Sequence, residues 1–190
     1  MTTITTHTSN DPVRCADGRT RPRWASRGEL SWIYFDEEWG RAPDSDSGLL
    51  EILSMIVFQL GITWQAVLAK RNTLRSAFAG FDPAAVARFG PEEVEFLLAD
   101  PGVFRNRRKI EAVINNAKAM LRLPEPVPVL LERYAGHHVH RPGDPVPLRT
   151  DGSSEAAAAL KEAGFSHIGP TGAFILMQAT GVVNGRAYMM

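Results

Sequence analysis

Residues 97–120 read LLADPGVFRNRRKIEAVINNAKAM, and after the tryptophan-containing residues 24–64 this stretch carries the strongest local pattern of the chain. A tight turn containing Pro and Gly separates two segments whose apolar residues recur at helical spacing. The pattern predicts a helix-hairpin-helix near residues 94–121, in which hairpin amides and a helix N-terminus hold the phosphates of DNA without sequence preference. The residues expected to contact DNA are Gly102, Arg105, Asn106, Arg107, Arg108 and Lys109.

Four of these six residues are cations within a span of five positions, which would supply the counterion release that sequence-neutral DNA binding requires. A second interpretation stays open on pattern alone. The same charges are typical of a solvated turn beside a core helix.

The rest of the chain predicts an all-α protein with a smaller subdomain formed by the N- and C-terminal segments. Residues 1–20 lack periodicity and predict a disordered tail, so the folded domain is expected over residues 21–190. Strand signals are nearly absent. Helices are expected over residues 31–35, from a cap at Asp46 or Ser47 through Leu60, from Thr63 to before Gly80, twice within 81–100, and over 107–121, 129–134, 153–163 and 171–181.

The composition of the 190 residues fits an ordinary globular protein with one domain. Lys plus Arg equals Asp plus Glu at 21 each, which excludes a uniformly basic surface but allows a local basic patch. Cys15 is the only cysteine, so no disulfide framework exists and a reducing compartment is expected. No signal peptide and no apolar run of membrane-spanning length appear, so we expect a cytoplasmic monomer without membrane contact.

A second stretch, residues 24–64, holds all four tryptophans of the protein. Flat aromatic faces gathered in one segment suit a flat ligand, and a nucleobase is the commonest such ligand. Packing of the same rings in an ordinary core explains the spacing equally well. Asp36 and Glu38 lie beside these aromatic residues and are weak catalytic candidates, since carboxylates near such a pocket can stabilise positive charge on a departing sugar.

Several kinds of chemistry have no support in the sequence. No nucleophile motif, phosphate loop or dinucleotide fingerprint is present. His137, His138 and His140 lie close together, but in a loop rich in Pro and Gly without a nearby cysteine. We therefore expect neither a metal nor a cofactor.

Six short motifs occur in order along the chain and with characteristic spacing. They are Tyr34-Phe35-Asp36-Glu37-Glu38-Trp39-Gly40, Gly61-Ile62-Thr63-Trp64, Phe81-Asp82-Pro83, Asp100-Pro101-Gly102-Val103, Gly169-Pro170-Thr171 and Met177-Gln178-Ala179. With these motifs the chain resembles the DNA-3-methyladenine glycosylase I family, a branch of the helix-hairpin-helix DNA glycosylases, from Arg21 to Arg186.

The resemblance implies a base excision repair enzyme that flips an alkylated purine into an aromatic pocket and hydrolyses its N-glycosidic bond. Its partner would be double-stranded DNA containing alkylated bases, that is, 3-methyladenine or a bulkier N-alkylpurine. The implied base pocket consists of Trp24, Tyr34, Trp39, Ile56, Gln59 and Trp64, with Trp64 as a stacking partner.

Two departures from the family pattern affect this expectation. The positions of the family's zinc ligands hold Pro22, Phe35, Arg186 and Met190, none of which is a zinc ligand, so the resemblance implies a zinc-independent member. The family glutamate that recognises the methylated base falls at Ile56, which cannot accept a hydrogen bond. The catalytic residue is therefore unknown.

Three functions remain compatible with these observations. The first is a monofunctional glycosylase with altered lesion choice, including a self-resistance enzyme against a DNA-alkylating natural product. The second is a catalytically silent protein that binds DNA lesions. The third is a diverged helical interaction module, although the retained aromatic residues and the basic hairpin argue against it.

Overall fold

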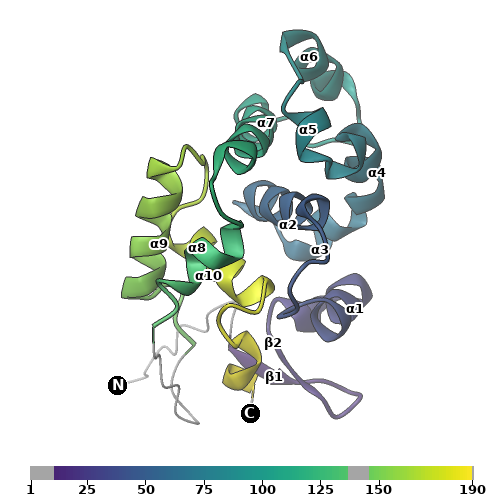
Figure 1. The fold of residues 1–190 in the computed structure, drawn as a ribbon. Coiled ribbons are helices and arrows are strands. Elements are labelled where there is room, and N and C mark those ends of the chain that lie inside the picture. The colour runs from purple at the N-terminus through teal and green to yellow at the C-terminus, as the bar shows by residue number, and fades with distance from the viewer. Residues whose placement is uncertain (1–10, 137–145, 190) are drawn as a thin grey trace, which may run out of the picture.

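The computed structural model describes residues 11–136 and 146–189. Two short strands precede a series of helices, and the helical fold is the all-α architecture expected from the sequence (Figure 1). The elements are β1 Pro12–Arg14, β2 Thr20–Pro22, η1 Ala25–Arg27, α1 Glu29–Glu37, α2 Asp46–Gln59, α3 Trp64–Ala69, α4 Arg71–Ala77, η2 Ala79–Phe81, α5 Pro83–Val86, α6 Pro91–Ala99, α7 Arg107–Arg122, α8 Val127–Glu132, α9 Asp151–Glu162, α10 Pro170–Ala179 and η3 Gly185–Met189.

Helix α2 is the centre of the fold and packs against α3, α7 and α10 (Figure 1). Nine of its fourteen residues are buried, and seven of these nine are apolar. A helix that is apolar around most of its circumference is stable only when other elements cover it on several sides. The C-terminal end of α2 is thereby held rigidly where it leads into α3.

The turn between α2 and α3 is built by local capping. Gly61 has a φ of 83°, a conformation that only glycine adopts readily, and it ends α2 as expected. Thr63 Oγ1 accepts a hydrogen bond from the amide of Ala66 at 3.2 Å, so it caps α3 as expected. The helix predicted from Thr63 to before Gly80 is instead two helices, because the chain departs from helical geometry at Lys70.

Other helix ends differ from the prediction by a few residues. The cap of α2 is Ser45, whose hydroxyl accepts from the amide of Gly48 at 3.1 Å, and not Asp46 or Ser47. Helix α9 begins after Thr150, which forms a reciprocal capping pair with Ser153. Several neighbouring polar side chains can accept the capping hydrogen bond at each helix, and only the folded structure shows which of them does so.

The expected disorder of residues 1–20 does not hold for residues 11–20. Strand β1 pairs with β2 in antiparallel register, with Val13 opposite Arg21. Strand β2 contacts η3, so the N- and C-terminal segments meet as expected (Figure 1). Residues 1–10 lie outside the described residues. Three-residue strands are too short to show alternation in the sequence, which is why they were missed.

Helix α6, the turn at residues 100–106 and helix α7 lie where the helix-hairpin-helix is expected, and α6 packs on α7. Asn106 caps α7 by accepting from the amide of Lys109 at 3.2 Å. None of the helices within residues 11–136 and 146–189 has both the length and the apolar character needed to cross a membrane.

Candidate functional site

Four aromatic side chains from α1, α3 and the flanking turns form one cluster. The rings of Tyr34 and Trp64 are stacked, with centroids 5.5 Å apart and planes inclined by 25°. Trp39 meets Trp64 edge-on at 5.8 Å, and Trp24 lies 4.9 Å from Trp39. Such offset and edge-on arrangements are the favourable geometries of aromatic pairs, so the cluster is rigid without a ligand.

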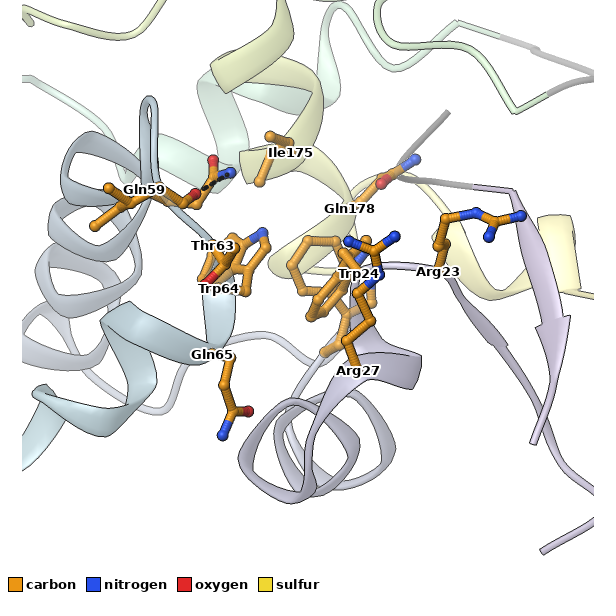
Figure 2. Close-up of a pocket in the computed structure, with 11 residues that line it drawn as sticks. Arg23, Trp24, Arg27, Gln59, Thr63, Trp64, Gln65, Ile175 and Gln178 are labelled. Atoms are coloured by element: carbon orange, nitrogen blue, oxygen red, sulfur yellow. Dashed lines mark hydrogen bonds between the residues drawn. The ribbon is translucent and has the colours of Figure 1, made fainter. Parts of the chain in front are cut away.

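A cavity of about 570 Å³ opens beside this cluster. The C-terminal end of α2 and the start of α3 supply one side, α10 supplies another, and the segment around η1 supplies the third (Figure 2). Its lining residues are Arg23, Trp24, Arg27, Trp39, Gln59, Ile62, Thr63, Trp64, Gln65, Ile175 and Gln178. A concave site of this volume, with apolar walls and a few polar groups, is typical of small-molecule recognition.

Four of the six residues expected in the pocket line this cavity: Trp24, Trp39, Gln59 and Trp64. Tyr34 does not line it. The Tyr34 ring is buried behind Trp64 and supports that indole.

Ile56 does not line the cavity either, so its assignment to the pocket surface is wrong. Its side chain is fully buried in the core. Its Cγ2 lies 3.6 Å from the position that a Cβ on Gly172 of α10 would occupy. An apolar residue at this place allows α2 and α10 to pack closely. Alignment of Ile56 with a pocket residue of the family therefore does not predict that Ile56 lies in the core.

The spacing of the two tryptophans limits how a flat ligand binds. The ring centroids of Trp24 and Trp64 are 5.5 Å apart, with planes inclined by 38°. For a flat ring to lie between two indoles, the two indole planes must be about 7 Å apart, which allows a contact of about 3.5 Å on each face. In this conformation a planar ligand therefore stacks on an indole surface that lines the cavity and does not insert between the two indoles.

Neither of the two candidate catalytic carboxylates lines the cavity. Asp36 accepts from Arg21 at 2.6 and 3.0 Å, and the hydrogen bond from Arg21 holds the pKa of Asp36 below its usual value. Glu38 forms a two-pronged ion pair with Arg71 at 2.5 and 2.6 Å. Both are engaged in structural pairs, so the suggestion that either acts in catalysis is not supported by their placement.

Within the described part of the chain, the cavity lining contains no Asp or Glu, and its charged side chains are Arg23 and Arg27. The buried Glu51 is also turned away, since it pairs with Arg71 and Arg75 at 2.7 and 2.6 Å. Burial alone would raise the pKa of Glu51. The two arginines outweigh that effect and lower it.

Seven of the lining residues were not assigned to the pocket from the sequence, although three of them lie in its motifs: Arg23, Arg27, Ile62, Thr63, Gln65, Ile175 and Gln178. Most of them are separated in sequence from the aromatic stretch or lie in its turns, and only the fold brings them together. One signal was available. Gln178 is the only amide side chain in the otherwise largely apolar helix α10.

The hairpin at Gly102 is fixed by contacts to α4. The Gly102 carbonyl accepts from Lys70 Nζ at 2.9 Å, and a Cβ at this position would lie 2.5 Å from Thr73 Cγ2. A larger residue at this position would have to displace the side chain of Thr73. The Gly102 amide donates to Asp100 Oδ1 at 2.7 Å, so this amide already has a partner.

The four hairpin cations differ in their availability. Arg105 and Arg108 are exposed and form no ion pair within the described residues. Arg107 pairs with Glu95 at 2.5 Å.

Lys109 has a structural role that the sequence analysis did not anticipate. Its ammonium group donates to the carbonyls of Phe58, at 2.9 Å, and of Leu60. It thereby satisfies the last carbonyls of α2, a place where a cation is favourable. Burial lowers the pKa of Lys109. Lys109 therefore holds α7 against the end of α2 and is not freely available to DNA.

Three of the four zinc-ligand positions implied by the resemblance come together, and none of them is a metal ligand. Pro22 and Phe35 are buried and line a narrow gap beside η3. The guanidinium of Arg186 lies 4.9 Å from the centroid of the Phe35 ring. The fourth position, Met190, lies outside the described residues, as do His137, His138 and His140. The donor set at these positions does not fit zinc.

Arg186 connects η3 to α1 through main-chain carbonyls. It donates to Trp39 O at 3.0 and 3.2 Å, to Asp36 O at 3.1 Å and to Phe35 O. A guanidinium with several donors in one plane is suited to such convergent acceptors. Elsewhere in the described residues, no group of three or more His, Cys, Asp or Glu side chains is placed to hold a metal ion.

Comparison with known proteins agrees with this architecture. A family model described as methyladenine glycosylase matches residues 24–189. The chain is 36% identical over 169 residues to DNA-3-methyladenine glycosylase 1 of Escherichia coli (strain K12), covering 85% of this chain and 90% of that protein. It is 31% identical to DNA-3-methyladenine glycosylase of Haemophilus influenzae, covering 87% and 93%.

Solved structures show the same similarity. A crystal structure of 3-methyladenine DNA glycosylase I superposes with a TM-score of 0.79 at 33% identity, covering 90% of this chain and 94% of that one. A solution structure of 3-methyladenine DNA glycosylase I gives a TM-score of 0.74 at 35% identity, covering 85% and 90%. The chain belongs to the methyladenine glycosylase family.

Proposed function

We propose that this protein is a monofunctional DNA glycosylase of base excision repair that releases an N-alkylated purine from double-stranded DNA. The observation that carries the proposal is the cavity of about 570 Å³ with an indole wall formed by Trp24, Trp39 and Trp64. Membership of the methyladenine glycosylase family supports it. The cavity gives a flipped purine an aromatic face on which to stack.

Cleavage of the N-glycosidic bond needs little catalytic assistance from the protein once the base is flipped. Alkylation at N3 or N7 places a positive charge on the purine. When the C1′–N bond breaks, its electron pair passes to the base, which leaves as a neutral molecule. Water adds to C1′ and loses a proton, which leaves an abasic site. Aromatic faces that hold the cationic base attract its charge, and no acid is needed to protonate the leaving group.

We assign binding of the DNA backbone to the helix-hairpin-helix. Exposed Arg105 and Arg108 beside the N-terminus of α7 are the cations that support this assignment. Arg107 is available only in part, because it pairs with the exposed Glu95. We further propose that the protein acts as a monomer in the cytoplasm.

Base release from methylated duplex DNA tests the proposal. Purified protein is incubated with DNA treated with a methylating agent, and the released bases are identified by mass. Duplexes carrying bulkier N-alkylpurines are tested in parallel, since the cavity volume is ample for a small purine. Enzyme-dependent release of an alkylpurine is the expected result. Absence of release from every substrate would overturn the proposal.

A silent lesion-binding protein is the second candidate, and one observation favours it. The described residues that line the cavity include no carboxylate to stabilise positive charge on the sugar. This candidate predicts tighter binding to methylated than to unmodified duplex, with no released base. The same assay, combined with a binding measurement, separates the two functions.

A further inference from the structure

Gln178 has an unusual position in the cavity. It lies near the C-terminal end of α10, its side chain is only 7% exposed, and it lines the cavity together with Trp24 and Trp64 (Figure 2). Its amide forms no hydrogen bond within the described part of the chain. Buried polar groups are normally hydrogen-bonded, so an amide left open to a cavity is available to a ligand.

The other two glutamines of the cavity are already engaged. Gln59 Nε2 donates to the carbonyl of Ile62 at 3.3 Å, which stabilises the turn after α2. Gln65 Oε1 accepts from the amide and the hydroxyl of Ser31 at 3.2 and 3.1 Å. Of the three, Gln178 alone has an amide whose donor and acceptor both lack a partner among residues 11–136 and 146–189.

The side chain of Gln178 is supported from behind by η3. A Cβ at Gly185 would lie 3.1–3.2 Å from Cβ, Cγ and Cδ of Gln178, so the backbone of η3 is packed tightly against this side chain. Arg186, the next residue, connects η3 to the carbonyls of α1 and Trp39. The amide therefore sits on a rigid support, as expected of a group that determines specificity.

The chemistry of the amide indicates which base edge it fits. A glutamine amide offers an N–H donor beside a carbonyl acceptor. Adenine presents the complement, the N6 amino group beside the N7 acceptor, whereas guanine presents two acceptors, O6 and N7. We propose that Gln178 reads the flipped base and favours an adenine-type over a guanine-type alkylated purine, an inference that rests on the proposed function.

The test compares wild type with Gln178→Met, which keeps the length and apolar volume of the side chain but removes the amide. Gln178→Glu is the second variant, because it keeps the size and loses the N–H donor. Thr180→Val is the matched control. Thr180 is buried at the end of the same helix, donates to the carbonyl of Leu176 at 2.8 Å and does not line the cavity.

Two quantities are measured for each protein. The first is the ratio of released 3-methyladenine to 3-methylguanine and 7-methylguanine from methylated DNA. The second is the affinity for free 3-methyladenine and free 3-methylguanine, followed by tryptophan fluorescence. Gln178→Met should lose about tenfold of the adenine preference, the size expected for one reading contact. Gln178→Glu loses the donor to N7 but keeps an acceptor for the N6 amino group, so it should weaken binding of both bases and keep the preference for adenine. Thr180→Val should keep the wild-type ratio.

The outcomes separate the inference from the function on which it rests. If wild type releases base and Gln178→Met keeps its adenine preference, the role of Gln178 is wrong and the proposed function stands. If wild type releases no base, the proposed function fails, and the free-base affinities decide the role of Gln178. Equal affinity of wild type and Gln178→Met for 3-methyladenine would then overturn it.

Discussion

At the scale of single residues, the cavity depends on the groups that support its aromatic walls. Tyr34 stacks behind Trp64, and burial raises the pKa of Tyr34, so the phenol stays neutral. Trp39 is held through its carbonyl by Arg186, which comes from the other end of the chain. These supports fix the walls before any ligand arrives, which reduces the ordering cost of binding.

Replacement of Arg186 tests the importance of this support. Arg186→Ala removes the donors for three main-chain carbonyls and should lower the free energy of unfolding by about 2–3 kcal/mol. Arg186→Lys keeps the charge with fewer converging donors and should have an intermediate effect. Arg133→Ala is the control, because its pair with Glu125 is exposed and contributes little. Denaturant titration measures all three, and an unchanged midpoint for Arg186→Ala would refute the supporting role.

At the scale of elements, the helix-hairpin-helix has some residues that pack against neighbouring helices and others that are exposed to solvent. Lys109 and Gly102 attach the motif to α2 and α4. Arg105 and Arg108 remain exposed. Affinity for DNA and stability of the protein should therefore respond to different residues of the same motif.

The double variant Arg105→Ala/Arg108→Ala should bind every duplex more weakly, methylated or not, because phosphate contacts carry no sequence information. The slope of log affinity against log salt concentration should fall by about 1.8 if both contact phosphates. The thermal stability should stay close to wild type.

Lys109→Ala is the contrasting variant, since it leaves the last carbonyls of α2 without a donor and should lower stability. Fluorescence anisotropy at several salt concentrations measures the DNA affinities. An unchanged salt slope in the double variant would place the DNA surface elsewhere.

The sequence predicts helices well where periodicity is long and caps are local. The apolar stripe of α7 and the cap at Thr63 are examples. The sequence does not predict β1 and β2, because strands of three residues are too short to show alternation and β2 is held by contacts distant in sequence, such as the ion pair of Arg21 with Asp36. For the site it predicts the tryptophans, which are close in sequence. It misses Gln178, which only the packing of α10 brings into the cavity.

At the scale of the whole molecule, a partly buried cluster of charges joins the end of α1 to α2 and α4. Glu51 accepts from Arg71 and Arg75, and Arg71 also pairs with Glu38 and lies 5.6 Å from the ring of Tyr34. The cluster lies behind the aromatic wall. Its integrity therefore couples the stability of the fold to the geometry of the cavity.

The charge of Glu51 makes this coupling depend on pH. Its pKa is lower in the folded than in the unfolded state, so its contribution to stability is complete above the unfolded value of about 4.3 and is lost as the pH falls through the folded pKa.

Glu51→Gln should cost about 2 kcal/mol near neutral pH, because Arg71 and Arg75 lose the charged acceptor that they share, while Arg71 keeps its pair with Glu38. The difference from wild type should shrink below about pH 4. Glu125→Gln, at an exposed pair, serves as control. Denaturation at pH values from 3 to 8 should show this convergence, and a constant difference over the whole range would exclude the proposed linkage.

Stacking of a flipped purine on Trp64 is the central claim, and single-turnover release of 3-methyladenine from methylated duplex tests it most directly. Wild type is compared with Trp64→Ala, which removes the indole supported by Tyr34, and with Trp32→Ala, which removes an indole that does not line the cavity. Loss of stacking of about 1–3 kcal/mol predicts release that is roughly 5- to 150-fold slower for Trp64→Ala, and within about twofold of wild type for Trp32→Ala. Release by Trp64→Ala at the wild-type rate would show that the purine does not stack on Trp64.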